Sequence, residues 1–229
     1  MTNEIRRSWP WLVAGVAFAA YPLLRPYANE TTMAGLAAMG SDRWLVAHLL
    51  GMLAFAVLPV GLARLAVRDA PHPRLARSLG PLGYLGAVLL LPYYGGEAFA
   101  LHAVGQHGVA ASDLSMLTVA GDFRFNPVAM TTFGLGLVVL AVTGVLAVVV
   151  CWPRGRGWRV AAGLVGLGLL LYLPQFFAAP AVRIGHGVLL GLGCWGVALV
   201  SARWRTSAAA YRFSVGRESV VESAATNAS

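Results

Sequence analysis

The chain has 229 residues, of which 58% are hydrophobic and only 11% charged, with a formal net charge of +8. Soluble domains carry roughly a quarter charged residues, so this composition excludes an ordinary soluble protein and favours an integral membrane protein. All 17 basic residues are Arg, and the lack of Lys beside abundant Ala and Gly is typical of a GC-rich bacterial genome. The two cysteines, Cys151 and Cys194, have no CxxC partner, which argues against a disulfide framework and a Cys-ligated metal site.

Six apolar stretches follow one another along the chain, and each is long enough to cross a bilayer as a helix of about 20 residues. They cover residues 9–27, 44–67, 79–101, 127–152, 160–179 and 184–202. The first follows Arg6 and Arg7 like a secretory signal, but it has no clean small-residue cleavage site, so we expect a retained helix. The sequence therefore predicts an all-α polytopic transmembrane bundle of about six spans in residues 1–205. A polar tail, residues 206–229, is predicted to be disordered.

The arginines are distributed unevenly about these predicted spans. Thirteen fall on the side of the two termini, and four, Arg25, Arg43, Arg124 and Arg183, fall on the other side. The positive-inside rule then places both termini on the cytoplasmic side of a cell (plasma) membrane. We expect contact with membrane lipids and none with nucleic acid. The longest outer connection, residues 102–126, is expected to hold a short interfacial helix near 110–119.

Proline beside aromatic residues closes the first, third and fifth stretches, at Pro22, Pro92 and Pro174. Three repeated helical hairpins would explain this recurrence. The general preference of aromatic residues for membrane interfaces would explain it as well, and both interpretations stay open. A proline also frees backbone carbonyls one turn below, which then need protein or water partners.

Glu97 is the only acidic residue within a predicted span. At 1.5 Å per residue it lies about 6 Å inside the end of its stretch, near the outer rim of the membrane. A carboxylate there costs several kcal/mol unless it is paired, protonated or wet. Glu97 is therefore expected either to pair with an outer Arg or to act as a catalytic acid or base, with Asp122 expected to neutralise the neighbouring Arg124.

Three histidines, His48, His102 and His186, share this outer level. With Glu97 they could form a zinc or iron site, or two of them could ligate a haem. No HExxH spacing occurs, and Glu97 and His102 point about 140° apart on a regular helix unless Gly95-Gly96 breaks it. The alternative is that each His is an interfacial hydrogen-bonding residue.

Outer arginines and aromatic residues supply a further hypothesis, a pocket for an anionic or apolar ligand. The alternative is that they anchor the helices at the headgroup level and form an aromatic belt. The candidate ligand-binding residues are Arg25, Arg43, Tyr93, Tyr94, Gln175 and Arg183.

Three segments together, residues 21–27, 91–102 and 173–186, resemble multi-pass membrane proteins of actinobacteria, a family without an established activity. The resemblance would span most of residues 8–204. It implies a class of protein and a host type, and no mechanism.

Three function hypotheses follow from these residues. The first is a membrane protein that binds a small or lipid-like, anionic or apolar ligand in an outer-facing polar pocket. The second is a membrane-embedded enzyme on an isoprenoid or lipid substrate, with Glu97 as acid or base and His48 and His186 assisting. The third is a haem or metal carrier using His48, His102 and His186. The identity of any cofactor is not predicted.

Overall fold

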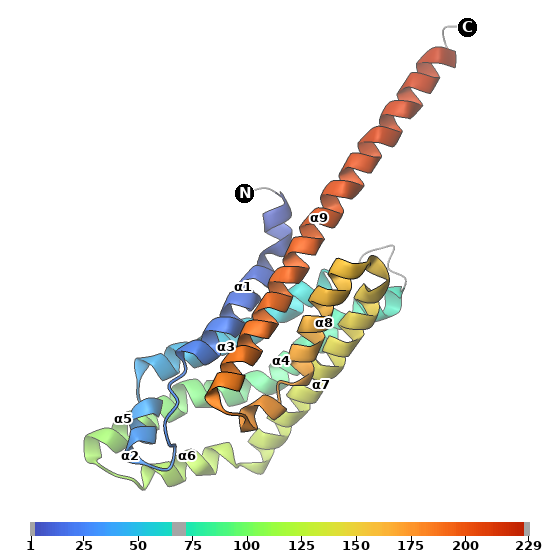
Figure 1. The fold of residues 1–229 in the computed structure, drawn as a ribbon. Coiled ribbons are helices and arrows are strands. Elements are labelled where there is room, and N and C mark those ends of the chain that lie inside the picture. Colours follow the sequence, from blue (N-terminus) through green and yellow to red (C-terminus); the bar gives the residue numbers. More distant parts are fainter. Residues whose placement is uncertain (1–2, 66–71, 227–229) are drawn as a thin grey trace.

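The computed structural model describes the backbone of residues 3–65 and 72–226 and the side chains of residues 8–65 and 72–203. Throughout the described backbone all regular structure is helical, which confirms the predicted all-α fold. Long helices run side by side along one axis, and α9 projects beyond the others (Figure 1). The long helices are α1 (Asn3–Leu24), α3 (Asp42–Ala63), α4 (Pro73–Gly95), α7 (Pro127–Cys151), α8 (Arg156–Leu170) and α9 (Pro180–Thr226).

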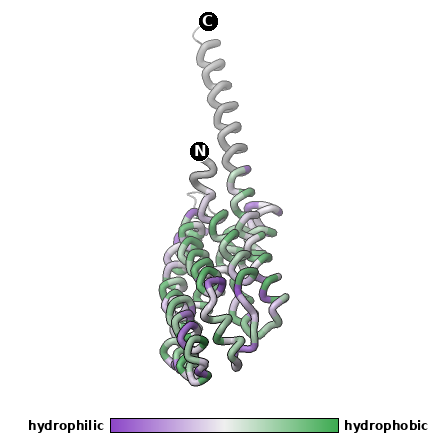
Figure 2. The backbone as a smooth tube through the Cα atoms, turned by 90° about the vertical axis from the view of Figure 1, so that its left-hand side faces the viewer, coloured by the Kyte–Doolittle hydropathy of each residue, from purple (hydrophilic) through white to green (hydrophobic). Residues whose placement is uncertain are grey.

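Each predicted apolar stretch overlaps one of these long helices. By length and composition, four helical segments are suited to cross a membrane: Asp42–Ala63, Pro73–Ala111, Pro127–Arg154 and Pro180–Arg203. Ser8–Leu24 is a shorter apolar helix. Hydrophobic positions run along much of the bundle (Figure 2). The chain is therefore a helical bundle of the membrane-protein type.

The long helices form a closed ring in chain order. α1 packs on α3, α3 on α4, α4 on α7, α7 on α8 and α8 on α9, and α9 returns to pack on α1. The α3–α4, α7–α8 and α8–α9 connections are shorter than those from α1 to α3 and from α4 to α7, which contain further helices. The interior is filled with large side chains that are almost fully buried, including Phe18, Phe55, Leu58, Leu90 and Leu140.

The two ends of the ring differ. One end, here termed the capped end, carries the short helices α2 (Met33–Met39), α5 (Leu101–Ala111) and α6 (Met116–Arg124) (Figure 1). The opposite end, here termed the arginine end, carries the α3–α4 and α7–α8 connections and the 3₁₀ helix η2 (Trp152–Arg154). Two further short elements lie toward the capped end, the π-helix η1 (Gly96–Ala100) and the 3₁₀ helix η3 (Pro174–Phe177).

The connection from α4 to α7 differs from the expectation of one short helix near residues 110–119. Two helices, α5 and α6, occupy it, and the chain turns in the middle of the expected helix. Ser112 ends α5 in a left-handed conformation with φ 53°. The Asp113 carboxylate accepts hydrogen bonds from the backbone N–H and the hydroxyl of Ser115 at 2.8 and 2.9 Å. Such local bonds compete with helix and favour a turn.

The predicted disorder of the polar tail, residues 206–229, stays a prediction. The backbone of α9 continues through it as a helix to Thr226. The side chains beyond residue 203 lie outside those that the structure describes, and the separation of a tail from the bundle stays a prediction.

Glycines allow the short helices to approach the bundle closely. A Cβ at Gly105 in α5 would lie 2.3 Å from the backbone nitrogen of Gly40, which ends α2. A Cβ at Gly96 would lie 2.0 Å from the ring of Phe123 in α6. Neither space could hold a methyl group without displacing its neighbour, so both contacts depend on glycine.

We predict that Gly96→Ala destabilises the protein by about 1–3 kcal/mol, because the added methyl overpacks the contact with Phe123. Gly95→Ala is the matched control, since no atom lies within 4 Å of a Cβ at that position. The measurement is thermal unfolding of each purified variant in the same detergent. Equal unfolding temperatures for the two variants would show that the close approach of α6 is unimportant.

Candidate functional site

Glu97 lies where the helix containing α4 changes its hydrogen-bond pattern. The Leu101 N–H bonds to the Gly96 carbonyl, five residues back, so η1 is a π-helix rather than an α-helix. Pro92 has no N–H to donate, and Gly95 and Gly96 tolerate a widened turn. Single π-turns inside α-helices are frequent at functional sites. The widened turn places Glu97 inside the capped end, where only 8% of its surface is exposed.

Arg124, at the end of α6, is the main partner of Glu97. Its Nε donates to Glu97 Oε1 at 2.8 Å and its Nη2 donates to Oε2 at 2.9 Å. This bidentate geometry is the strongest form of an ion pair between Arg and a carboxylate. The side chains are 16% and 11% exposed, so water screens the pair weakly. The Arg124–Glu97 ion pair therefore links α6 to the π-turn.

A second carboxylate joins the same arginine from another part of the chain. Glu30, in the α1–α2 connection, accepts a hydrogen bond from Arg124 Nη1, and it also accepts one from Arg25 Nη2 at 2.7 Å. Arg25 follows α1 directly and is buried. The ion network therefore consists of Arg25, Glu30, Glu97 and Arg124, and it links three segments: the α1–α2 connection, η1 and α6.

Trp44 and His48, which both belong to α3, pack against this ion network. The Trp44 indole N–H donates to the Glu97 carbonyl at 2.7 Å. The Arg25 guanidinium lies 4.5 Å from the Trp44 ring, a cation–π geometry. His48 Nδ1 hydrogen-bonds the Trp44 carbonyl at 2.8 Å, and its Nε2 lies 3.8 Å from Glu97 Oε2. His48 is therefore held by its own helix and faces the carboxylate.

The ion network is neutral, with two guanidinium groups and two carboxylates. Burial alone would raise the pKa of Glu30, but the charges of Arg124 and Arg25 and their hydrogen bonds outweigh it and lower that pKa. Burial would lower the pKa of Arg124, and its bonds to Glu97 and Glu30 raise it instead. Each charge thus stabilises its partner, which leaves little uncompensated positive charge to attract an anion.

The predicted partner of Arg124 was wrong. Asp122 is exposed and Arg124 pairs with Glu97 and Glu30. In a helix, residues two apart point to different faces, whereas the π-turn and the α1–α2 connection bring distant carboxylates to one side of α6. Of the two expectations for Glu97, the geometry supports pairing with an outer Arg.

The metal and haem hypotheses gain no support from the histidines. Among the described residues no group of three or more His, Cys, Asp and Glu side chains is gathered closely enough to hold a metal ion. The π-turn does break the geometry between Glu97 and His102, as the glycines allowed, but His102 Nε2 hydrogen-bonds the Gln106 amide at 3.1 Å. His186 Nε2 hydrogen-bonds the Gly168 carbonyl at 2.7 Å. These ring nitrogens already have partners within the protein.

His186 has a structural role at the end of α8. The Tyr172 N–H bonds to the Leu169 carbonyl, three residues back, so the Gly168 carbonyl is left for a side chain. His186 supplies that donor from α9. This is the capping of an unsatisfied helix-end carbonyl, which a membrane interior makes especially costly to leave unpaired.

Tyr94 and Tyr172 lie between His48 and His186 in the core of the bundle. The hydroxyls of Tyr94 and Tyr172 lie 3.0 Å apart and share a hydrogen bond. The His48 ring lies 6.1 Å from the Tyr94 ring, and the His186 ring lies 5.3 Å from the Tyr172 ring. Tyr94 is therefore a buried core residue rather than a wall of an open pocket.

Of the remaining predicted ligand-binding residues, Tyr93 contacts the ion network through the Arg124 backbone, and the others belong to separate segments. Arg43 is exposed at the start of α3. Tyr93 stacks on Phe133 at 4.4 Å, and its hydroxyl donates to the Arg124 carbonyl at 3.4 Å. Arg183 lies 5.4 Å over the Tyr27 ring, and Gln175 is buried in η3. Only Arg25 of this set carries a charge within the network.

Sequence reasoning left two network residues, Glu30 and Arg124, and the adjacent Trp44 out of the candidate site. The signal available for Glu30 and Arg124 was the presence of both charges on the outer side near an intramembrane carboxylate. Trp44 gave no such signal, because a Trp at a helix start is common at membrane interfaces.

Comparisons with protein-family models, with curated proteins and with solved structures found no match to this chain. Its function therefore has to be inferred from the geometry itself.

We predict that Glu97→Gln destabilises the protein by about 3 kcal/mol, because it leaves the buried Arg124 guanidinium without its bidentate partner. Asp122→Asn, an exposed acid on the same helix as Arg124, removes the same charge and should change stability by less than about 0.5 kcal/mol. Thermal unfolding in detergent measures both. A double variant, Glu97→Gln with Arg124→Gln, should regain part of the loss, and strict additivity would argue against the pair.

Acid should weaken the ion network through Glu30. The folded state lowers the pKa of this carboxyl below its ordinary value of 4.5, so its stabilisation is complete above that value and is lost as pH falls through the lower, folded pKa. Between about pH 6 and about pH 3, the unfolding temperature should fall more for the parent chain than for Glu30→Gln. Parallel curves for the two proteins would contradict this role of Glu30.

Proposed function

We propose that this chain is a membrane protein with six crossings, its termini in the cytoplasm and its capped end outside, and that it binds the apolar chain of a lipid-like ligand laterally. The binding site is a groove between α7 and α8. The proposal rests on one observation: this groove is apolar, and it opens on the side of the bundle to the surroundings of the helices. The asymmetric placement of arginine supports the orientation.

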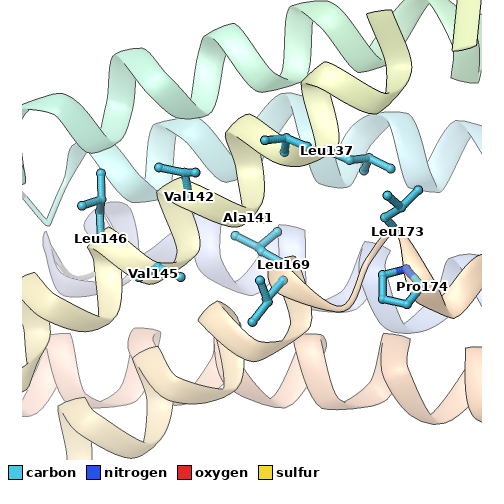
Figure 3. Close-up of a pocket in the computed structure, with 10 residues that line it drawn as sticks. Leu137, Ala141, Val142, Val145, Leu146, Leu169, Leu173 and Pro174 are labelled. Carbon is cyan, nitrogen blue, oxygen red and sulfur yellow. The ribbon is translucent and has the colours of Figure 1, made fainter. Parts of the chain in front are cut away.

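The groove has a volume of about 450 Å³ and is lined by apolar side chains (Figure 3). This volume lies within the range of ~300–1,000 Å³ found for small-ligand sites. The lining residues are Leu137, Val138, Ala141, Val142, Val145, Leu146, Leu169, Leu170, Leu173 and Pro174. A surface with no polar lining residue selects a hydrocarbon chain over a polar ligand.

The early end of α8 accounts for the groove. α8 has 15 residues and spans about 22 Å at 1.5 Å per residue, which is less than the ~30 Å hydrocarbon core. α7 has 25 residues and continues past the point where α8 ends. The chain then turns through η3, and His186 hydrogen-bonds the Gly168 carbonyl. The flank of α7 opposite this break is therefore left partly uncovered.

The geometry of the ion network favours a structural role, in which it stabilises the capped end of the bundle. Both carboxylate oxygens of Glu97 accept hydrogen bonds from Arg124, which occupies the lone pairs that a general base would use. The enzyme hypothesis based on Glu97 and the hypothesis of an anion site at Arg25 therefore have less support than the lateral groove.

The test uses a photoactivatable fatty acid added to the purified protein in detergent micelles. We expect cross-linked peptides from residues 137–146 and 169–174. Ala141→Phe fills the groove with a ring and should reduce this cross-linking by about tenfold, equivalent to a loss of about 1.4 kcal/mol in binding.

Val88→Phe is the matched control, because Val88 is 65% exposed on α4, away from the groove, and also gains a ring. Its cross-linking should equal that of the parent chain. Cross-links spread evenly over all exposed helix faces, or an equal loss in both variants, would refute the lateral site.

A further inference from the structure

Arg183, in the first turn of α9 at the capped end, is held by aromatic rings. Its guanidinium lies 5.4 Å from the centre of the Tyr27 ring and 5.6 Å from the centre of the Phe176 ring. Both distances fall within the range of ~6 Å for a cation–π contact. The rings fix the position of the guanidinium but supply no oxygen to accept from its N–H groups. Among the described side chains, that of Arg183 makes no hydrogen bond and no ion pair, so its donors are available to a ligand.

The carboxylates described at the capped end have other partners or lie on other helices. Glu30 and Glu97 pair with Arg25 and Arg124 in the neutral ion network. α9 packs on α1 and α8, whereas the remaining described acidic residues lie on α3, after α5 and on α6. These residues are Asp42, Asp113 and Asp122.

The acidic residues whose side chains are not described are too far along the backbone to reach Arg183. Glu4 is in the first turn of α1, about 30 Å from the end of that helix that adjoins the start of α9. Glu218 and Glu222 lie on α9 itself, about 50 Å or more beyond Arg183. Asp69 belongs to the short α3–α4 connection at the arginine end, within about 14 Å of a described neighbour. Backbone positions alone therefore leave Arg183 without a counter-ion.

Phe176 links this arginine to the groove between α7 and α8. In Figure 3, Leu137 and Pro174 mark the end of the groove nearer the capped end. Phe176 belongs to η3, which begins with Pro174, and its ring lies 5.7 Å from the Phe133 ring. Phe133 precedes Leu137 by about one turn of α7. The two rings therefore lie just beyond the groove, and Arg183 lies next to them.

We propose that this groove binds a single-chain amphiphile with a carboxylate head, the class to which fatty acids belong, and that Arg183 binds the carboxylate. The inference rests on the proposed lateral groove and names the chemistry of its ligand. The acyl chain lies along α7 from Leu137 to Leu146, a distance of about 13 Å. The head lies beyond the two rings, at the level of Arg183.

Charge and shape favour a carboxylate over other headgroups. The planar guanidinium matches a carboxylate in bidentate geometry. One guanidinium balances the single charge of a carboxylate, whereas a phosphate monoester carries about −1.5 to −2. Arg183 also lies in the first turn of its helix, where the helix dipole disfavours a cation, so a bound carboxylate offsets an unfavourable position. A neutral ester head gains none of these interactions.

Arg43 provides a matched control at the same end of the bundle. It is exposed at the start of α3, and α3 packs on α1 and α4 rather than beside the groove. Arg43→Gln therefore removes the same charge from the capped end without changing the proposed site.

The experiment uses two photoactivatable probes with the same chain, a fatty acid and its methyl ester. Each is titrated into the purified chain in detergent micelles at about pH 8, where a carboxyl group is ionised. Both should cross-link to residues 137–146 and 169–174, and the acid should bind about tenfold more tightly than the ester. Arg183→Gln should abolish this preference by weakening the acid alone, whereas Arg43→Gln should retain it.

Three results would overturn the proposal: equal binding of acid and ester to the parent chain, an unchanged preference in Arg183→Gln, or equal losses in Arg183→Gln and Arg43→Gln. Acetate should not compete with the acid probe, because it lacks the chain. Competition by acetate would indicate a simple anion site and would also overturn the proposal.

Cross-linking of the ester reports whether each variant retains the groove. If Arg183→Gln does not fold, Arg183→Met is the second variant, because its unbranched side chain can pack on the two rings without a charge. It should lose the preference for the acid, and retention of that preference counts against the site. Lack of groove cross-links from both probes would refute the lateral groove itself. Groove cross-links without a preference for the acid would refute the carboxylate site alone.

Discussion

A carboxylate inside an apolar helix is the constraint on which the capped end depends. Glu97 cannot remain charged and unpaired in that position, so the fold has to bring a cation to it. Arg124 does so in bidentate geometry, and Glu30 and Arg25 extend the pairing until the charges balance. The short helices after α4 take their positions from this requirement as much as from apolar contacts.

Because the ion network is neutral, it has little attraction for an anionic ligand. A pair of arginines with two carboxylates attached presents little net charge, and Trp44 covers one face of Arg25. Open surface lies instead on both flanks of α8. That helix ends early toward the capped end and packs on α9 through glycines toward the arginine end. One short helix thus borders both the groove toward α7 and a second groove toward α9.

The two flanks of α8 differ in chemistry for a topological reason. The groove toward α7 lies along the middle of the bundle, where charged residues are costly, and its lining is apolar throughout. The groove toward α9 reaches the arginine end, and Arg156 and Arg203 are among its lining residues.

The sequence by itself determined the helical class and the location of the six long helices, because the length and hydrophobicity of each stretch are properties of the chain alone. It left open which outer Arg pairs with Glu97, and it did not predict the break between α5 and α6. For His186 it left a ligand, a catalyst and a hydrogen-bonding residue as alternatives, and the structure shows a hydrogen bond to the Gly168 carbonyl. Those outcomes depend on which helix faces meet. The π-turn at Gly96, the left-handed Ser112 and the early end of α8 each rotate or displace a segment, and only tertiary packing fixes which distant side chains then come together.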